Sequence, residues 1–223
     1  ITSSGSMYVI GFTILIGILL EFIHATESDK NFIHFISSKL GVNSPLKARL
    51  VPFTIGTLIF TDTNLSIVSS GIISRSLFDK FKIPRQSLAF IVDATCAPVS
   101  VLVLLNGWGA FISQLLEANG IEEPMAVTFS TIQYNFYPII VLILVLFTVL
   151  SGKYYGPLAK SKFEEHREIP GDTGTYDLNR VLILAVPLIS VVISCLVLLY
   201  LTGDGDIKKG SGSLSVFYAI VIS

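Results

Sequence analysis

Residues 50–73 read LVPFTIGTLIFTDTNLSIVSSGII, an apolar run whose middle is interrupted by the polar cluster 61–64. The cluster contains Asp62, and an ionised carboxylate in hydrocarbon is so costly that it usually faces a polar cavity. Backbone that is not helical is tolerated at membrane depth only where it is buried in protein or lines a cavity. We therefore predict that this run forms two short helical halves that meet at a polar tip.

The composition of the whole chain is typical of a membrane protein. Of the 223 residues, 52% are hydrophobic and 14% are charged, whereas a soluble domain carries roughly 25% charged residues. The formal net charge is −1, so no basic face for a nucleic-acid partner is expected. Cys96 and Cys195 lie in apolar segments and are expected to be small buried side chains.

The apolar segments predict an all-α polytopic membrane protein, because a helix needs about 20 apolar residues to cross a bilayer. These segments are 7–23, 50–73, 88–116, 129–151, 180–201 and 213–223. The last one is too short to cross, and the chain begins at Ile1 without an initiating Met. We therefore expect residues 1–223 to be part of a larger membrane domain, completed by the rest of the same polypeptide.

Basic residues in the connectors predict the topology. Connectors 24–49, 74–87 and 152–179 each carry four Lys or Arg residues, and connector 117–128 carries none. Short basic loops stay on the cytoplasmic side, so we expect a multi-pass protein of the cell membrane with 152–179 as a cytoplasmic linker. Segment 50–73 would then begin and end on one side, which indicates a re-entrant hairpin rather than a straight crossing.

Segment 88–116 is long for a single crossing and contains two points of weakness. Pro98 has no backbone N–H and disfavours a regular helix, so we predict a broken helix with the break or kink near Thr95. A second weak point is the stretch 106–109, Asn-Gly-Trp-Gly. Each break would leave free carbonyls on one stub and free N–H groups on the other, which bind cations and anions respectively.

Asp62 and Asp93 are the acidic residues deep inside apolar runs, and they are the candidate ion-binding groups. A carboxylate in such a place can hold a proton or a metal cation, but not both well. Hard cations prefer oxygen ligands, so a Na⁺ site is expected at Asp62, Asp93 and Thr95. Further oxygen ligands would come from Thr63, Asn64 and Ser66.

Simpler interpretations of the same residues stay open. Asp62 could cap a helix in a loop outside the membrane, and Asp93 could cap a helix start. Ser69, Ser70 and Ser100 are expected to be packing residues, since hydroxyls in apolar helices usually bond to their own backbone.

The stretch 56–108 resembles the NhaC-type sodium/proton antiporter family of the ion-transporter superfamily. The resemblance is carried by Ile83-Pro84-Arg85-Gln86-Ser87-Leu88-Ala89-Phe90 and by Asp93-Ala94-Thr95-Cys96-Ala97-Pro98-Val99. In the family pattern Asp62 matches the first Asp of a pair, while Thr63 replaces the second and Ser66 replaces an Asn. The resemblance implies inverted repeats with re-entrant hairpins and broken helices, of which this chain would supply one half.

The leading functional hypothesis is a membrane transporter domain that exchanges Na⁺ for H⁺, with no cofactor beyond the transported ions. An alternative is a Na⁺- or H⁺-coupled carrier of organic anions or amino acids on the same fold, which the missing second Asp favours. A third is a membrane protein that binds partners without transporting. No nucleophile–base pair, metal-ligand spacing or phosphate loop points to an enzyme. Expected partners are the lipid bilayer, an inorganic cation or small organic solute, and a second copy in a homodimer.

Overall fold

A computed structural model describes residues 4–28, 31–32, 35, 41–60, 63–164 and 177–223. Every regular element in these residues is helical. The chain divides into two compact units. The α1 unit comprises residues Ile1–Ser28, Ser100–Phe136 and Leu182–Ser223, and the α3 unit comprises Asp29–Val99 and Tyr137–Val181.

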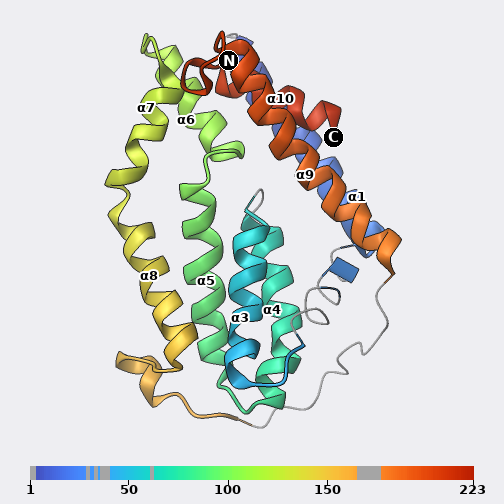
Figure 1. The fold of residues 1–223 in the computed structure, drawn as a ribbon, viewed down its shortest axis with the longest axis vertical. Coiled ribbons are helices and arrows are strands. Elements are labelled where there is room, and N and C mark those ends of the chain that lie inside the picture. Colours follow the sequence, from blue (N-terminus) through green and yellow to red (C-terminus); the bar gives the residue numbers. More distant parts are fainter. Residues whose placement is uncertain (1–3, 29–30, 33–34, 36–40, 61–62, 165–176) are drawn as a thin grey trace. The chain divides into compact units, whose positions relative to one another are not determined.

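Four α-helices lie wholly or mostly in the described part of the α3 unit, and Figure 1 labels them along the chain. They are α3 (Pro45–Leu58), α4 (Thr63–Lys80), most of α5 (Arg85–Leu102) and most of α8 (Phe136–Ser151), followed by the 3₁₀ turn η2 (Gly156–Lys160). Within this unit, the start of α3, the end of α4, the start of α5 and the end of α8 all lie at one end (Figure 1). We call this the basic end, because Lys47, Arg49, Lys80, Lys82 and Lys153 lie there.

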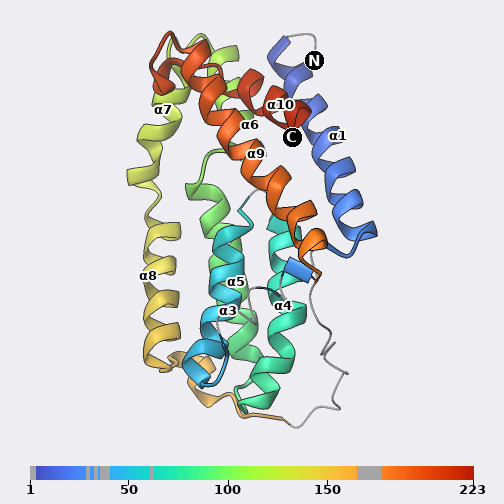
Figure 2. The same cartoon turned by 45° about the vertical axis from the view of Figure 1, so that its right-hand side comes forward.

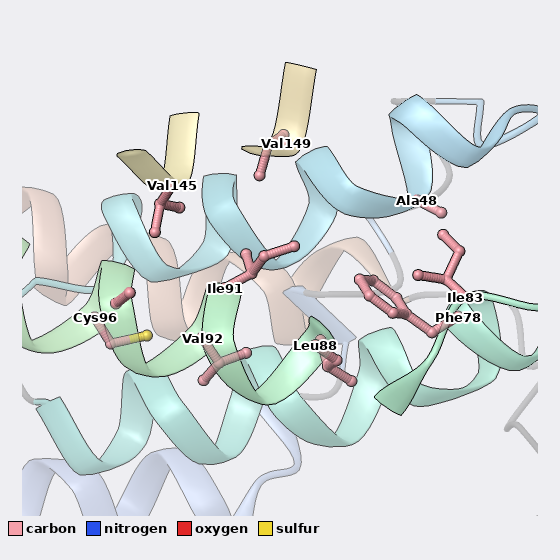
Figure 3. Close-up of a cluster of buried hydrophobic side chains, with 10 residues drawn as sticks. Ala48, Phe78, Ile83, Leu88, Ile91, Val92, Cys96, Val145 and Val149 are labelled. Atoms are coloured by element: carbon pink, nitrogen blue, oxygen red, sulfur yellow. The ribbon is translucent and has the colours of Figure 1, made fainter. Parts of the chain in front are cut away.

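The core of the α3 unit is a cluster of buried side chains from all four helices. Leu88 and Val92 of α5 point toward α4, and Ile91 points toward α3 (Figure 3). Val145 and Val149 of α8 are fully buried in the same cluster. Cys96 is buried as well and is not in a disulfide, as its apolar setting predicted.

Helices α3 and α4 form an antiparallel pair that lies side by side in both views (Figures 1 and 2). Ser44 begins α3, and its side chain accepts a hydrogen bond from the Lys47 N–H at 3.3 Å. The helix ends at Leu58, and α4 begins at Thr63. The expected interruption of the run 50–73 is therefore present, whereas a re-entrant path into a membrane and an inverted repeat are not shown by the fold.

The α1 unit contains α1 (Ser4–Ala25), α6 (Gly107–Ala118), α7 (Pro124–Thr131), most of α9 (Leu178–Thr202) and α10 (Gly212–Ile222). The short 3₁₀ turns η1 (Ile132–Tyr134) and η3 (Ile207–Lys209) complete it. Helix α10 packs on α1 and α6, and α6 packs on α7. Phe12, Val191, Leu199 and Ala219 contribute to its buried core.

The predicted helix break at Pro98 is wrong. Helix α5 continues through Pro98 to Leu102, and the interruption falls at residues 103–106. One missing N–H is tolerated inside a packed apolar helix, and Pro98 is buried. The second weak point, at Asn106, is the real break.

The geometry at this break explains its position. The Asn106 side-chain oxygen accepts hydrogen bonds from the N–H groups of Trp108 and Gly109, and its Nδ2 donates to the Ser100 carbonyl at 2.7 Å. A Cβ on Gly109 would lie 1.8 Å from the carbonyl oxygen of Leu104, so the chain can turn here only with glycine. The first N–H groups of α6 are thus already capped.

Four helical stretches of the described chain are apolar and long enough to cross a membrane. They are Gly5–Ile23, Arg85–Ala118, Phe136–Lys160 and Leu178–Thr202. Helix α10 is apolar but shorter. These stretches match the predicted segments other than 50–73, which confirms the all-helical fold of a chain with several apolar helices.

Candidate functional site

Asp93 lines an open groove between α4 and α5, which we call the α4–α5 groove. Its volume is about 690 Å³. Its lining consists of Ile67, Val68, Gly71, Ile72 and Arg75 from α4, and Arg85, Leu88, Ala89, Val92 and Asp93 from α5. The residues on each helix recur every three or four positions, so each set forms one helical face. The groove is therefore apolar along its length, with three charged side chains.

The two arginines of the groove have different surroundings. Arg85 binds Asp79 at both carboxylate oxygens, with Nε–Oδ1 at 3.1 Å and a terminal nitrogen–Oδ2 at 2.6 Å. Arg75 is exposed, and no ion pair joins it to another of the described residues. Asp93 is also exposed and makes no ion pair within that part of the chain.

A second polar cluster is buried between α3, α4 and α5. The Ser66 hydroxyl donates to the Gly56 carbonyl at 3.3 Å, and Ser70 lies 3.9 Å from the sulfur of Cys96. A Cβ on Gly56 would lie 2.9 Å from Cys96 Sγ and 3.2 Å from Thr95 Cγ2. The glycine therefore lets α3 approach α5 closely at this level.

Several hydroxyls in this unit are buried without a hydrogen-bond partner. In the part of this unit that the structure describes, they are the hydroxyls of Ser69, Ser74, Ser87, Thr95 and Tyr154. A buried hydroxyl without a partner is unfavourable by about 1–3 kcal/mol. Thr95 is fully buried beside Gly56, so its oxygen could accept a ligand that approaches this interface.

The predicted site residues fall into separate places. Asp62 lies outside the described residues. Thr63 and Asn64 open α4, where Thr63 is half-buried and Asn64 is exposed. Ser66 and Thr95 meet the buried cluster, whereas Asp93 lies in the α4–α5 groove.

Helical geometry separates Asp93 from Thr95. Two residues along an α-helix differ by about 200° around the axis, so these side chains leave α5 on opposite sides. The structure therefore does not bring Asp93 together with Thr95 and Ser66. No group of three His, Cys, Asp or Glu side chains that could hold a metal occurs among the described residues.

Sequence reasoning missed the two arginines as members of the site. It assigned Arg75 and Arg85 to a basic connector that indicated topology, and Arg85 also to a motif of the family resemblance. A signal was present: Ile67, Gly71 and Arg75 follow one another at four-residue intervals, which places them on one face of a helix. The serines judged to be packing residues are indeed buried, namely Ser69, Ser70 and Ser100.

Comparison with known proteins found a relative that matches most of this chain. A Haemophilus influenzae protein described as uncharacterized is 28% identical to this chain over 212 residues. The match covers 90% of this chain and 40% of the Haemophilus protein. The chain therefore spans about 40% of the length of that relative. No family model and no solved structure matches the chain.

Proposed function

We propose that the chain belongs to a secondary transporter of the NhaC type that exchanges Na⁺ for H⁺, with Asp93 as the exchanging carboxylate. The observation that supports this most is the place of Asp93, in an apolar groove within a helical stretch, Arg85–Ala118, that is long enough to cross a membrane. Ionisable groups inside membrane-spanning segments usually mark ion pathways or proton relays. One carboxylate that binds either a cation or a proton suffices for an exchange cycle.

The buried cluster at Gly56, Ser66 and Thr95 has a separate role in this proposal. Its hydroxyls would supply oxygen ligands near the break between α3 and α4, where the sequence also places Asp62 and Thr63. Asp93 and Thr95 leave opposite sides of α5, so they would serve two positions along an ion path and not one shared coordination shell. The multi-pass, re-entrant arrangement in the cell membrane is part of the same proposal.

The test uses the full-length protein in proteoliposomes with a pH-sensitive dye inside and an imposed pH gradient. Na⁺, Li⁺ and K⁺ are added one at a time. We expect Na⁺ or Li⁺ to dissipate the gradient, and Asp93→Asn to abolish this response while the protein still inserts. Asp204→Asn is the matched control, because it makes the same chemical change at an exposed turn. Full exchange by Asp93→Asn would refute the role of Asp93.

A second candidate function is a carrier of organic anions or amino acids. Arg75 and Arg85 favour it, because two guanidinium groups in an apolar groove suit a carboxylate ligand. If none of the added cations dissipates the pH gradient although the protein is inserted, the carrier becomes the favoured function. It predicts uptake of radiolabelled dicarboxylates or amino acids under a Na⁺ gradient, and loss of that uptake in Arg75→Gln.

A further inference from the structure

We propose that the α4–α5 groove binds an anionic phospholipid, with the phosphate at Arg75 and Arg85 and an acyl chain along the apolar lining. This site shares the α4–α5 groove with Asp93, but the observations that support it do not involve the exchange reaction proposed above. Three features of the groove support it: its charge, its shape, and its position at the basic end of the α3 unit.

The charge at the arginine end suits a phosphate. Arg75 is exposed and forms no ion pair among the described residues. Arg85 uses two of its N–H groups on Asp79, and a guanidinium has five, so several donors remain for a second anion. Lys80 and Lys82 follow within the same turn region and are exposed, which adds positive potential.

The rest of the groove suits a hydrocarbon chain. Val68 and Ile72 are 48% and 57% exposed, and both line the groove with Leu88 and Val92. A Cβ built on Gly71 would meet no atom within 4 Å, so open space continues beside this glycine. The α4–α5 groove is apolar with two arginines at one end, which matches the shape and charge of an acyl chain joined to an acidic head group.

The lipid phosphate and the Asp93 carboxylate, which are both negatively charged, would lie apart in the groove. Asp93 lies eight residues after Arg85 on α5, which corresponds to about 12 Å along the helix axis. A phosphate held by the arginines at the other end of the groove would therefore not share its position with the Asp93 carboxylate.

The position of the groove agrees with the place of lipid heads in a bilayer. Arg85 begins α5, and the other helix ends at this level carry Lys47, Arg49 and Lys153. Basic clusters beside membrane helices attract acidic lipids by about 1 kcal/mol per Lys or Arg, and basic pockets between helices bind acidic head groups. The same clusters mark the cytoplasmic side.

The experiment reconstitutes the full-length protein in vesicles of nine parts phosphatidylcholine to one part phosphatidylglycerol, then extracts it in mild detergent. Native mass spectrometry counts the phosphatidylglycerol that each molecule retains. We compare the wild type with Arg75→Gln, Gly71→Leu and Lys82→Gln. Gly71→Leu fills the apolar part without changing charge, and Lys82→Gln removes a charge at the basic end outside the groove.

We expect the wild type to retain phosphatidylglycerol over phosphatidylcholine and Arg75→Gln to weaken this retention about fivefold. Gly71→Leu should weaken it to a similar degree, whereas Lys82→Gln should weaken it much less, because Lys82 lies outside the groove and adds only to the surrounding potential. Retention that falls in Arg75→Gln but not in Gly71→Leu would mean an anion site without an acyl chain, and would overturn the lipid assignment. Equal losses in Arg75→Gln and Lys82→Gln, or no enrichment in the wild type, would overturn it as well.

Discussion

Arg85 and Asp79 are joined by two parallel hydrogen bonds across the turn between α4 and α5. Their side chains are 26% and 20% exposed, so water screens the pair only in part. The bond ties the last turn of α4 to the first turn of α5 and fixes the arginine end of the α4–α5 groove.

The first prediction concerns this pair. Arg85→Gln and Asp79→Asn should each lower the free energy of unfolding by about 1 kcal/mol, because a paired, partly buried charge loses its partner. The double variant should lose less than the sum of the two single losses. Thermal unfolding of the full-length protein in detergent measures all three, and strictly additive losses would show that the pair contributes no coupling.

The second prediction concerns Gly109, which lies in the first turn of α6, directly after the break between α5 and α6. Gly109→Ala should lower stability by more than about 2 kcal/mol or prevent folding, because a Cβ cannot overlap a backbone oxygen and the backbone must shift. Gly17→Ala is the matched control, since a Cβ there meets no atom within 4 Å, and it should be neutral or slightly stabilising. Equal melting temperatures for the two variants would contradict the described turn.

The third prediction concerns the cap at Asn106. Asn106→Ala should destabilise the protein by about 1–3 kcal/mol, because two N–H groups and the Ser100 carbonyl lose their partner in a buried place. Asn106→Ser keeps a side-chain oxygen that can accept from the N–H groups of α6 and removes the donor to the Ser100 carbonyl. If Asn106→Ser restores none of the melting temperature lost in Asn106→Ala, the capping bonds are not what stabilises the break.

The fourth prediction concerns the close approach at Gly56. Gly56→Ala should destabilise the α3 unit, because its Cβ would meet Cys96 Sγ at 2.9 Å. Cys96→Ala removes that sulfur, so the double variant should recover part of the loss even though Cys96→Ala alone leaves a small cavity. A double variant that is less stable than both single variants would place the strain elsewhere.

The fifth prediction separates stability from function at Thr95. Its hydroxyl is buried without a partner in the described structure, so Thr95→Val should leave the protein equally stable or make it more stable by about 1 kcal/mol. If the hydroxyl is an ion ligand, the same change should weaken the apparent Na⁺ affinity in the proteoliposome assay. Thr148→Val is the control, because Thr148 already donates to the Leu144 carbonyl at 2.8 Å. Unchanged Na⁺ affinity in Thr95→Val would remove Thr95 from the ion path.

The local patterns of the sequence predicted the helices well. The polar cluster 61–64 located the interruption between α3 and α4, and the basic connectors placed the outer ends of this pair at one end, as the structure has them. The position of Pro98 did not predict the break, because a proline's effect on a helix depends on the packing around it. The helix ended instead where the Asn106 side chain can cap the next one.

The site could be predicted only in part, because side-chain direction depends on helix phase and on packing between helices. Asp93 and Thr95 are two residues apart and were assigned to one site, yet they leave α5 on opposite sides. Arg75 and Asp93 are distant in sequence and line one groove. Only the packing of α4 against α5 shows that these two residues line the same groove.

The antiparallel pairing of α3 and α4 has a consequence for the evolution of topology. A pair that leaves and returns to the same end contributes an even number of bilayer crossings, whether that number is zero or two. In the proposed multi-pass arrangement, deleting or duplicating α3 and α4 together would therefore preserve the sidedness of every later segment, whereas losing a helix that crosses once would invert all that follows. The pair is thus a unit that can be lost or copied without reorienting the rest of the protein.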